Sequence, residues 1–218
     1  MDAPAFFGAI EIDPAGLSTC ALFADGTVRC VGYNGTGALG DGTEVDRTAP
    51  VVVSGLTDAK AIVMGWYHAC ALRAGGVVSC WGFNGNGQLN DGTTTDHFTP
   101  QQVPGLTDVI AIASGAYDVC VRHPGGSAMC WAQGIETTVA IGEPLEQVLP
   151  GNRSTCARTS TGKIYCWGAN EYGTLGDGTF TYRATPGARA GIPLSCARSP
   201  TLVARAHGTR PCVIRPLQ

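Results

Sequence analysis

The sequence predicts an all-β fold that is built from repeated, turn-rich units of about 50 residues. Its 218 residues include 31 Gly and 13 Pro, which is a turn content unlike that of a helical bundle. A hydrophobic content of 44% at this length is enough for a substantial buried core. The ten cysteines recur at regular intervals, which indicates an internal repeat.

The cysteines define the repeat. Most of them form pairs with nine intervening residues, and the second and third pairs follow the first by 50 and 100 positions: Cys20 and Cys30, Cys70 and Cys80, Cys120 and Cys130, and Cys156 and Cys166. Three units also carry an Asp 11 residues after the second Cys and a Pro nine residues after that Asp: Asp41 and Pro50, Asp91 and Pro100, Asp177 and Pro186. These landmarks place three units in one register.

Each cysteine pair brackets a predicted β-hairpin. In the first unit, Ala24 to Gly26 forms a three-residue loop whose Gly can take a positive φ, so Cys20 faces Cys30 across the hairpin. Buried free thiols and zinc ligands are the alternatives to a disulfide, but zinc sites use closer spacings than these. The pattern favours four disulfides and an oxidising compartment. Cys196 and Cys212, with 15 intervening residues, are a further candidate pair.

Short apolar runs between the hairpins complete a four-stranded unit. The segments 59–64 and 109–114 read as strands, and 99–103 reads as an edge strand because its Pro cannot donate a hydrogen bond. We expect one repeat domain over 1–218. Its expected units are 9–58, 59–108, a shortened unit 109–145, 146–186, and 187–218, which is either a degenerate fifth unit or a non-native tail.

Three Gly-rich segments carry a family resemblance: Val31 to Thr43, Trp81 to Thr93 and Trp167 to Thr179. Together with the Gly-x-x-His-x-x-Ala-Leu stretch from Gly65 to Leu72, they resemble the regulator of chromosome condensation repeat. The resemblance implies β-propeller-type blades of four antiparallel strands, in a family whose propellers usually close with seven blades. We therefore expect a partial propeller of about four blades plus a remnant.

The repeat pattern fails in two places. The third unit lacks the Gly-rich segment after Trp131, and the sequence from Gly178 to Gln218 contains six Arg but no Asp, Glu or Lys. This last stretch is either a divergent closing segment or the product of a truncation or altered reading frame. Closure by one chain is not expected. Three arrangements would satisfy the pattern: an open arc, a fragment of a larger propeller, or self-association through open blade ends.

Charge excludes some function classes. Residues 1–150 carry 15 acids and 5 bases (−10), and residues 151–218 carry 2 acids and 9 bases (+7). The bases do not alternate with aromatic residues, so we predict no nucleic-acid partner. No run of apolar residues is long enough for a membrane span, and the first residues do not form a signal peptide, so secretion would be encoded outside this chain.

Two residue patterns invite a chemical interpretation, and both are better explained by structure. Ser18, His68, Asp118 and Ser154 share one repeat position, but neighbouring blades lie about 10 Å apart, too far for a catalytic triad. The resemblance implies a structural role for His68. The Asp-Gly pairs could suggest calcium, yet each loop supplies too few clustered acids, and a turn is favoured. We predict no catalytic residue, metal or cofactor.

The remaining candidates are aromatic side chains at positions that vary between units. These candidate binding residues are Tyr33, Trp66, Tyr67, Phe83, Phe98, Tyr117, Tyr172, Phe180 and Tyr182. The tryptophans that share one repeat position are expected in the core: Trp81, Trp131 and Trp167.

The predicted function is a non-enzymatic protein-binding or scaffold module that is extracellular, periplasmic or on the cell surface, with a protein partner that the sequence does not identify. The alternatives are a guanine-nucleotide exchange factor-like regulator of a small GTPase, a structural segment of a larger surface protein, and an enzyme that uses a propeller face.

Overall fold

The computed structural model describes residues 6–132 and 134–188, which form four sheets of four antiparallel strands. Each sheet runs in chain order from its first strand to its fourth. The first blade contains β1 (Ala9–Ala15), β2 (Ser18–Phe23), β3 (Val28–Gly32) and β4 (Arg47–Val52). The second contains β5 (Ala59–Met64), β6 (His68–Arg73), β7 (Val78–Gly82) and β8 (His97–Gln102).

The third and fourth blades repeat this arrangement. The third contains β9 (Ala111–Ser114), β10 (Asp118–Arg122), β11 (Ala128–Ala132) and β12 (Ile135–Thr138). The fourth contains β13 (Leu145–Pro150), β14 (Ser154–Thr159), β15 (Ile164–Gly168) and β16 (Arg183–Ala188). Single 3₁₀ turns, η1 (Ala74–Gly76) and η2 (Pro124–Gly126), close two of the hairpins.

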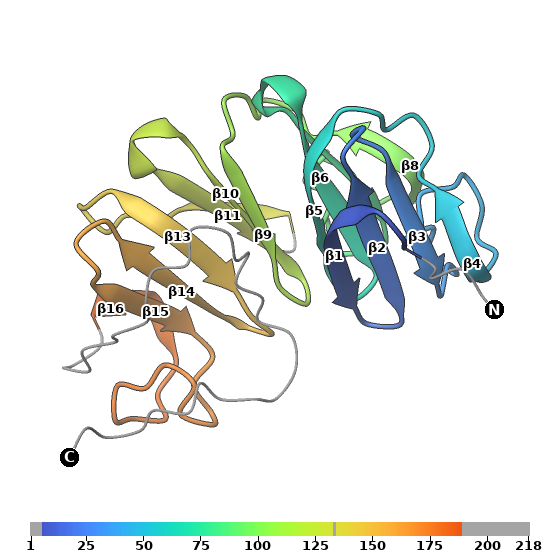
Figure 1. The fold of residues 1–218 in the computed structure, drawn as a ribbon. Coiled ribbons are helices and arrows are strands. Elements are labelled where there is room, and N and C mark those ends of the chain that lie inside the picture. The colour runs from blue at the N-terminus through green and yellow to red at the C-terminus, as the bar shows by residue number, and fades with distance from the viewer. Residues whose placement is uncertain (1–5, 133, 189–218) are drawn as a thin grey trace, which may run out of the picture.

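The blades are arranged as part of a propeller. Figure 1 shows the sheets fanned out in chain order, with β1, β5, β9 and β13 towards the middle and β4 and β16 at the outside. The inner strands of neighbouring blades contact one another, as β1 does with β5 and β5 with β9. The predicted all-β, partial-propeller fold is therefore confirmed. Within the described residues, no helix has the length and apolarity needed to cross a membrane.

A disulfide joins the two central strands of every blade. The bonds are Cys20–Cys30, Cys70–Cys80, Cys120–Cys130 and Cys156–Cys166, as the hairpin register predicts. The paired residues are directly opposed in the strand register, with Cα atoms 4.0–4.1 Å apart. Bonds of this kind are typical of proteins from an oxidising environment. The candidate pair Cys196 and Cys212 lies outside the described residues.

The shortened third unit has lost a loop rather than a strand. In the first blade, residues 33–46 connect β3 to β4, whereas only residues 133 and 134 lie between β11 and β12. The strand β12 still pairs with β11, with Met129 opposite Thr138 and Ala132 opposite Ile135. The missing Gly-rich segment therefore leaves the sheet at four strands.

The core lies between the blades. Cys20, Leu22 and Val28 of the first blade pack against Ile62 and Trp81 of the second in one buried cluster. The next two interfaces repeat this arrangement, with the disulfide of one blade facing the following blade. The apolar face of each sheet is thus buried against the next sheet, which is how a propeller hides its hydrophobic surface.

Tryptophan residues connect neighbouring blades through the Gly-rich loops. Trp81 donates its Nε1 hydrogen to the carbonyl of Ala38 in the preceding blade (3.0 Å), and Trp131 does the same to Gln88 (2.8 Å). Both indoles are buried, as expected for core residues. Trp167 is only half-buried, because the third blade has no Gly-rich loop to cover it.

The two end blades differ in exposure. On the first blade, Ile12 is 41% exposed, although Ile62, at the same repeat position of the second blade, is fully buried. On the fourth blade, Cys166 and Leu175 are both buried. The structure therefore shows an exposed apolar end face on the first blade.

Candidate functional site: an aromatic loop end

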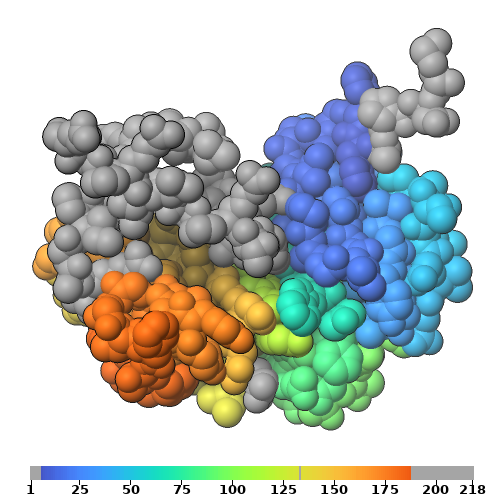
Figure 2. Space-filling view, turned by 90° about the horizontal axis from the view of Figure 1, so that it is seen from below, coloured from blue at the N-terminus to red at the C-terminus, as the bar shows by residue number. Residues whose placement is uncertain are grey.

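The antiparallel strand order gives the blades two distinct ends. One end, here called the loop end, carries the turns between the first and second strands of the blades and the described connections between their third and fourth strands: 16–17, 33–46, 65–67, 83–96, 115–117, 134, 151–153 and 169–182. The opposite, hairpin end carries the hairpin tips and the links between blades. Figure 2 views the molecule from the loop end, with the first blade in blue and the fourth in orange.

An asparagine organises each Gly-rich loop. The Asn34 carboxamide oxygen accepts a hydrogen bond from the Leu39 amide (2.9 Å), and its nitrogen donates to the Thr43 carbonyl (2.9 Å) and to the Asp41 carboxylate (3.1 Å). Asn34 is fully buried, so these bonds satisfy its side chain without water. Asn84 and Asn170 make the same contacts in the second and fourth blades.

The aspartate of each loop is also bound within the loop. Asp177 accepts hydrogen bonds from the Thr179 amide and hydroxyl, and its other oxygen accepts one from Arg183 (2.7 Å). The bonds from Thr179 and Arg183 lower the pKa of Asp177 to about 2. The equivalent Asp91 oxygen lies 2.6 Å from His97 Nε2. Within the described residues no group of three or more His, Cys, Asp or Glu is placed to bind a metal ion.

All nine candidate aromatic residues lie at the loop end. Trp66, Tyr67 and Tyr117 are on the inner turns, and the others are in, or directly after, the longer loops: Tyr33, Phe83, Phe98, Tyr172, Phe180 and Tyr182. Their exposure differs widely, from 91% for Tyr172 to half-buried for Tyr33. The sequence pattern alone had not shown that these positions share one end of the molecule.

The aromatic side chains of the inner turns take part in two contacting pairs, one of which includes Tyr33 of a longer loop. The rings of Trp66 and Tyr117 lie 5.2 Å apart and tilted, and those of Tyr33 and Tyr67 are 6.2 Å apart in an edge-to-face arrangement. The turns that carry them are joined by backbone bonds, since the Trp66 amide donates to the Ala116 carbonyl (3.0 Å). These contacts hold Trp66, 39% exposed, and Tyr67, 36% exposed, in fixed positions beside each other.

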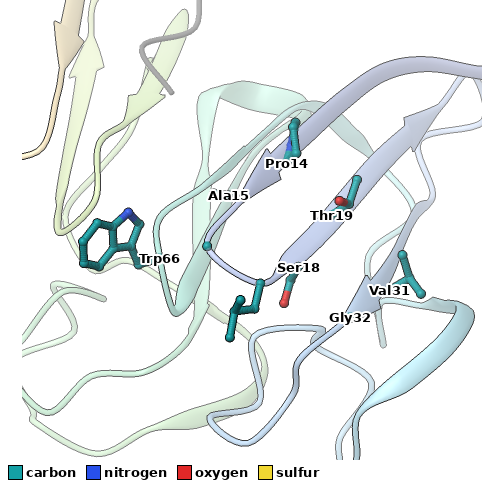
Figure 3. Close-up of a pocket in the computed structure, with 9 residues that line it drawn as sticks. Pro14, Ala15, Ser18, Thr19, Val31, Gly32 and Trp66 are labelled. Carbon is teal, nitrogen blue, oxygen red and sulfur yellow. The ribbon is translucent and has the colours of Figure 1, made fainter. Parts of the chain in front are cut away.

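An apolar hollow of about 710 Å³ opens beside this aromatic group. Pro14, Leu17, Val31 and Thr19 of the first blade form one side, and Trp66 of the second blade forms the other. Figure 3 shows the Trp66 indole across from the β1–β2 turn. Sequence reasoning missed the hollow, because its walls come from turns 50 residues apart and no sequence pattern marks Leu17.

The serine, histidine and aspartate that share one repeat position are held in separate environments. The Ser18 hydroxyl donates to the Tyr33 carbonyl (2.7 Å), whereas His68 is buried with its Nε2 3.5 Å from the Ser114 hydroxyl. Burial lowers the pKa of His68 to about 4, so it is neutral at pH 7. A Cβ at Gly65 would lie 2.0 Å from the His68 ring, so this glycine makes room for the imidazole.

Asp118 occupies the same repeat position in the third blade. It is partly buried at the start of β10, and burial raises the pKa of its carboxyl to about 6. A carboxylate in this position is costly at neutral pH, because the surrounding protein solvates it less well than water does.

Two family models describe these repeats. Both are models of the regulator of chromosome condensation (RCC1) repeat; one matches residues 25–72 and 76–121, and the other matches 59–88 and 151–174. Together they cover more than half of the chain. The chain belongs to the RCC1-repeat family.

Solved structures show the same fold as this RCC1-repeat chain. Human WBSCR16 is 19% identical, with a TM-score of 0.76 over 85% of this chain and 54% of that one. Yeast RCC1 (Prp20), solved bound to Kap60, is 18% identical, with a TM-score of 0.75 over 86% of this chain and 50% of that one.

The ectodomain of the Physcomitrella patens receptor kinase CR4 is 23% identical, with a TM-score of 0.53 over 73% of this chain and 39% of that one. The RCC1-repeat chain thus spans about half the length of the WBSCR16 and yeast RCC1 (Prp20) chains, and less than half of the CR4 chain. Comparison with curated protein sequences finds no match.

We predict that Asp118→Asn stabilises the protein at pH 7.5 but not at pH 4. The folded-state pKa is raised above the unfolded value, so the stability contributed by the protonated carboxyl is lost as pH rises through about 6. Removing the charge should raise the free energy of unfolding at pH 7.5 by about 1–2 kcal/mol, a value discounted for partial solvent exposure.

Urea unfolding of wild type and variant at both pH values measures this difference. The titration of His68 is common to the two proteins and cancels. An equal change in the free energy of unfolding at pH 7.5 and at pH 4 would contradict a raised pKa of Asp118.

Proposed function

We propose that this RCC1-repeat chain is a non-enzymatic, extracytoplasmic module that binds a protein partner through its loop end. The observation that carries the proposal is the gathering of nine variable aromatic side chains at one end of a rigid set of sheets. Aromatic side chains supply large contact areas at low entropic cost and are enriched at binding hot spots.

The four disulfides support the extracytoplasmic location. Cross-strand disulfides persist in oxidising compartments, and they are rare in the cytosol. The likeness in fold to a receptor kinase ectodomain is in accord with this location. Yeast RCC1 (Prp20), a protein of the same fold, was solved in complex with another protein, Kap60.

A role as an exchange factor for a small GTPase is less well supported. That activity belongs to a cytosolic or nuclear setting, in which four disulfides would not persist. An enzymatic role is less well supported, because among the described residues His68 is buried beside Ser114 and Ser18 is bound to a backbone carbonyl, so the two do not form a catalytic pair.

The loop end should capture a partner that the hairpin end does not. The immobilised full chain, exposed to the extracellular fraction of its source culture, should retain a protein that a Trp66→Ala/Tyr172→Ala variant loses by tenfold or more, about 1.4 kcal/mol. Quantitative mass spectrometry of the retained proteins measures the loss.

Phe7→Ala is the matched control, because Phe7 is an aromatic residue, 84% exposed, that precedes β1 at the hairpin end. Retention that is equal for the wild type and the loop-end variant would argue against the proposed function.

The exposed face of the first blade supports a further proposal, self-association. Ile10 and Ile12 are exposed there, and exposed apolar sheet faces favour association. Sedimentation velocity over a range of concentrations should show association that Ile12→Lys abolishes. A chain that stays monomeric at high concentration would rule this out.

A further inference from the structure

The two ends of the molecule carry different charge. Apart from the buried Asp13, the described acids at the loop end number nine: Asp41, Glu44, Asp46, Asp91, Asp96, Asp118, Glu136, Glu171 and Asp177. The same end carries three arginines, so its formal charge is 3 − 9 = −6. The rest of the described chain, again without Asp13, has six acids and six bases (6 − 6 = 0): Glu11, Asp25, Asp58, Asp108, Glu143 and Glu146, with Arg29, Lys60, Arg73, Arg122, Arg158 and Lys163.

The arginines of the loop end are already paired. Arg47 binds Asp41 (2.6 Å), Arg183 binds Asp177 (2.7 Å), and Arg153 lies 3.7 Å from Glu171. Among the described residues, no other acid at this end has a Lys or Arg partner. Glu44 and Glu136 in particular are exposed to solvent. The negative charge of this end is therefore available to a ligand.

The hollow beside Trp66 adds an apolar area to the loop end. The hollow between Leu17 and Trp66 contains no charged lining residue, and Leu17 is 67% exposed beside it. Protein-binding surfaces commonly combine apolar and aromatic residues with charged residues near them. An anionic partner such as nucleic acid or an acidic membrane would be repelled by the acids of the loop end.

We propose that the loop end recognises a Lys- or Arg-rich segment of a protein partner that places an apolar side chain in the hollow beside Trp66. This inference rests on the proposed function and specifies the chemistry of the partner. The acids of the loop end attract the cations of the segment, and the hollow buries its apolar side chain. The exposed Trp66 and Tyr67 also offer aromatic faces to a cation.

Three short peptides without tryptophan test the inference on the full chain. The first has lysines around a central Leu-Phe pair, the second has glutamates in place of the lysines, and the third keeps the lysines but replaces the pair with serines. Tryptophan emission of the protein, together with calorimetry, reports binding. We expect the first peptide to bind with an affinity at least about tenfold higher than either of the others. Its affinity should fall severalfold between about 0.05 M and 0.5 M NaCl.

Two charge-reversal variants locate the attraction. Glu44→Lys/Glu136→Lys changes the loop end, and Glu143→Lys/Glu146→Lys makes the same change in net charge elsewhere, at surface ion pairs that contribute little to stability. The first variant should lower the affinity for the lysine peptide by about fivefold or more, and the second should lower it by less than about twofold. Leu17→Ser, together with Trp66→Ala, should reduce the preference for the Leu-Phe pair.

The inference is overturned if the glutamate peptide binds as well as the lysine peptide, if no peptide binds, or if both charge-reversal variants weaken binding equally. Its failure is distinguishable from that of the proposed function. A captured partner that depends on Trp66 but is unaffected by salt and by Glu44→Lys/Glu136→Lys would leave the loop end as a binding site and exclude a basic ligand.

Discussion

The structure depends on the contact between one blade and the next. A single repeat cannot bury its own apolar face, and here the disulfide-bearing faces of the first three blades are each buried by the following blade. The most specific part of this contact is the indole of Trp81 or Trp131, which donates a hydrogen bond to a carbonyl in the Gly-rich loop of the preceding blade. Because that carbonyl is in a loop, the same interaction also fixes the loop end.

This coupling explains why the loop end can present side chains in fixed positions. Each Gly-rich loop is held from within by its Asn and Asp residues, as by Asn34 and Asp41. The loops of the first and second blades are also held from outside by the tryptophan of the next blade. Exposed aromatic residues on such loops need little ordering when a partner binds, which lowers the entropic cost of association. The fold thus provides a preorganised surface without any catalytic machinery being required.

Much of the fold could be predicted from the sequence, because the repeat places equivalent residues in equivalent environments. The nine-residue spacing of Cys20 and Cys30 gave the hairpin register and the disulfide, and the Asn and Asp of each Gly-rich segment indicated a locally bonded loop. Features formed between blades were harder to predict from the sequence. The hollow at Trp66 joins turns that are remote in sequence, and the partial exposure of Trp167 depends on a loop missing from the blade before it. The raised pKa of Asp118 likewise arises from burial, which sequence spacing does not report.

The most direct test of the interblade contact compares two identical substitutions. Trp81→Phe removes a buried indole and leaves the Ala38 carbonyl unpaired, which should lower the free energy of unfolding by about 2–4 kcal/mol. Trp167→Phe, at the same repeat position but half-buried and facing the shortened blade, should cost about 1 kcal/mol or less. Urea unfolding with the disulfides intact measures both. Equal losses would contradict the claim that the loop carbonyl and the indole hold neighbouring blades together.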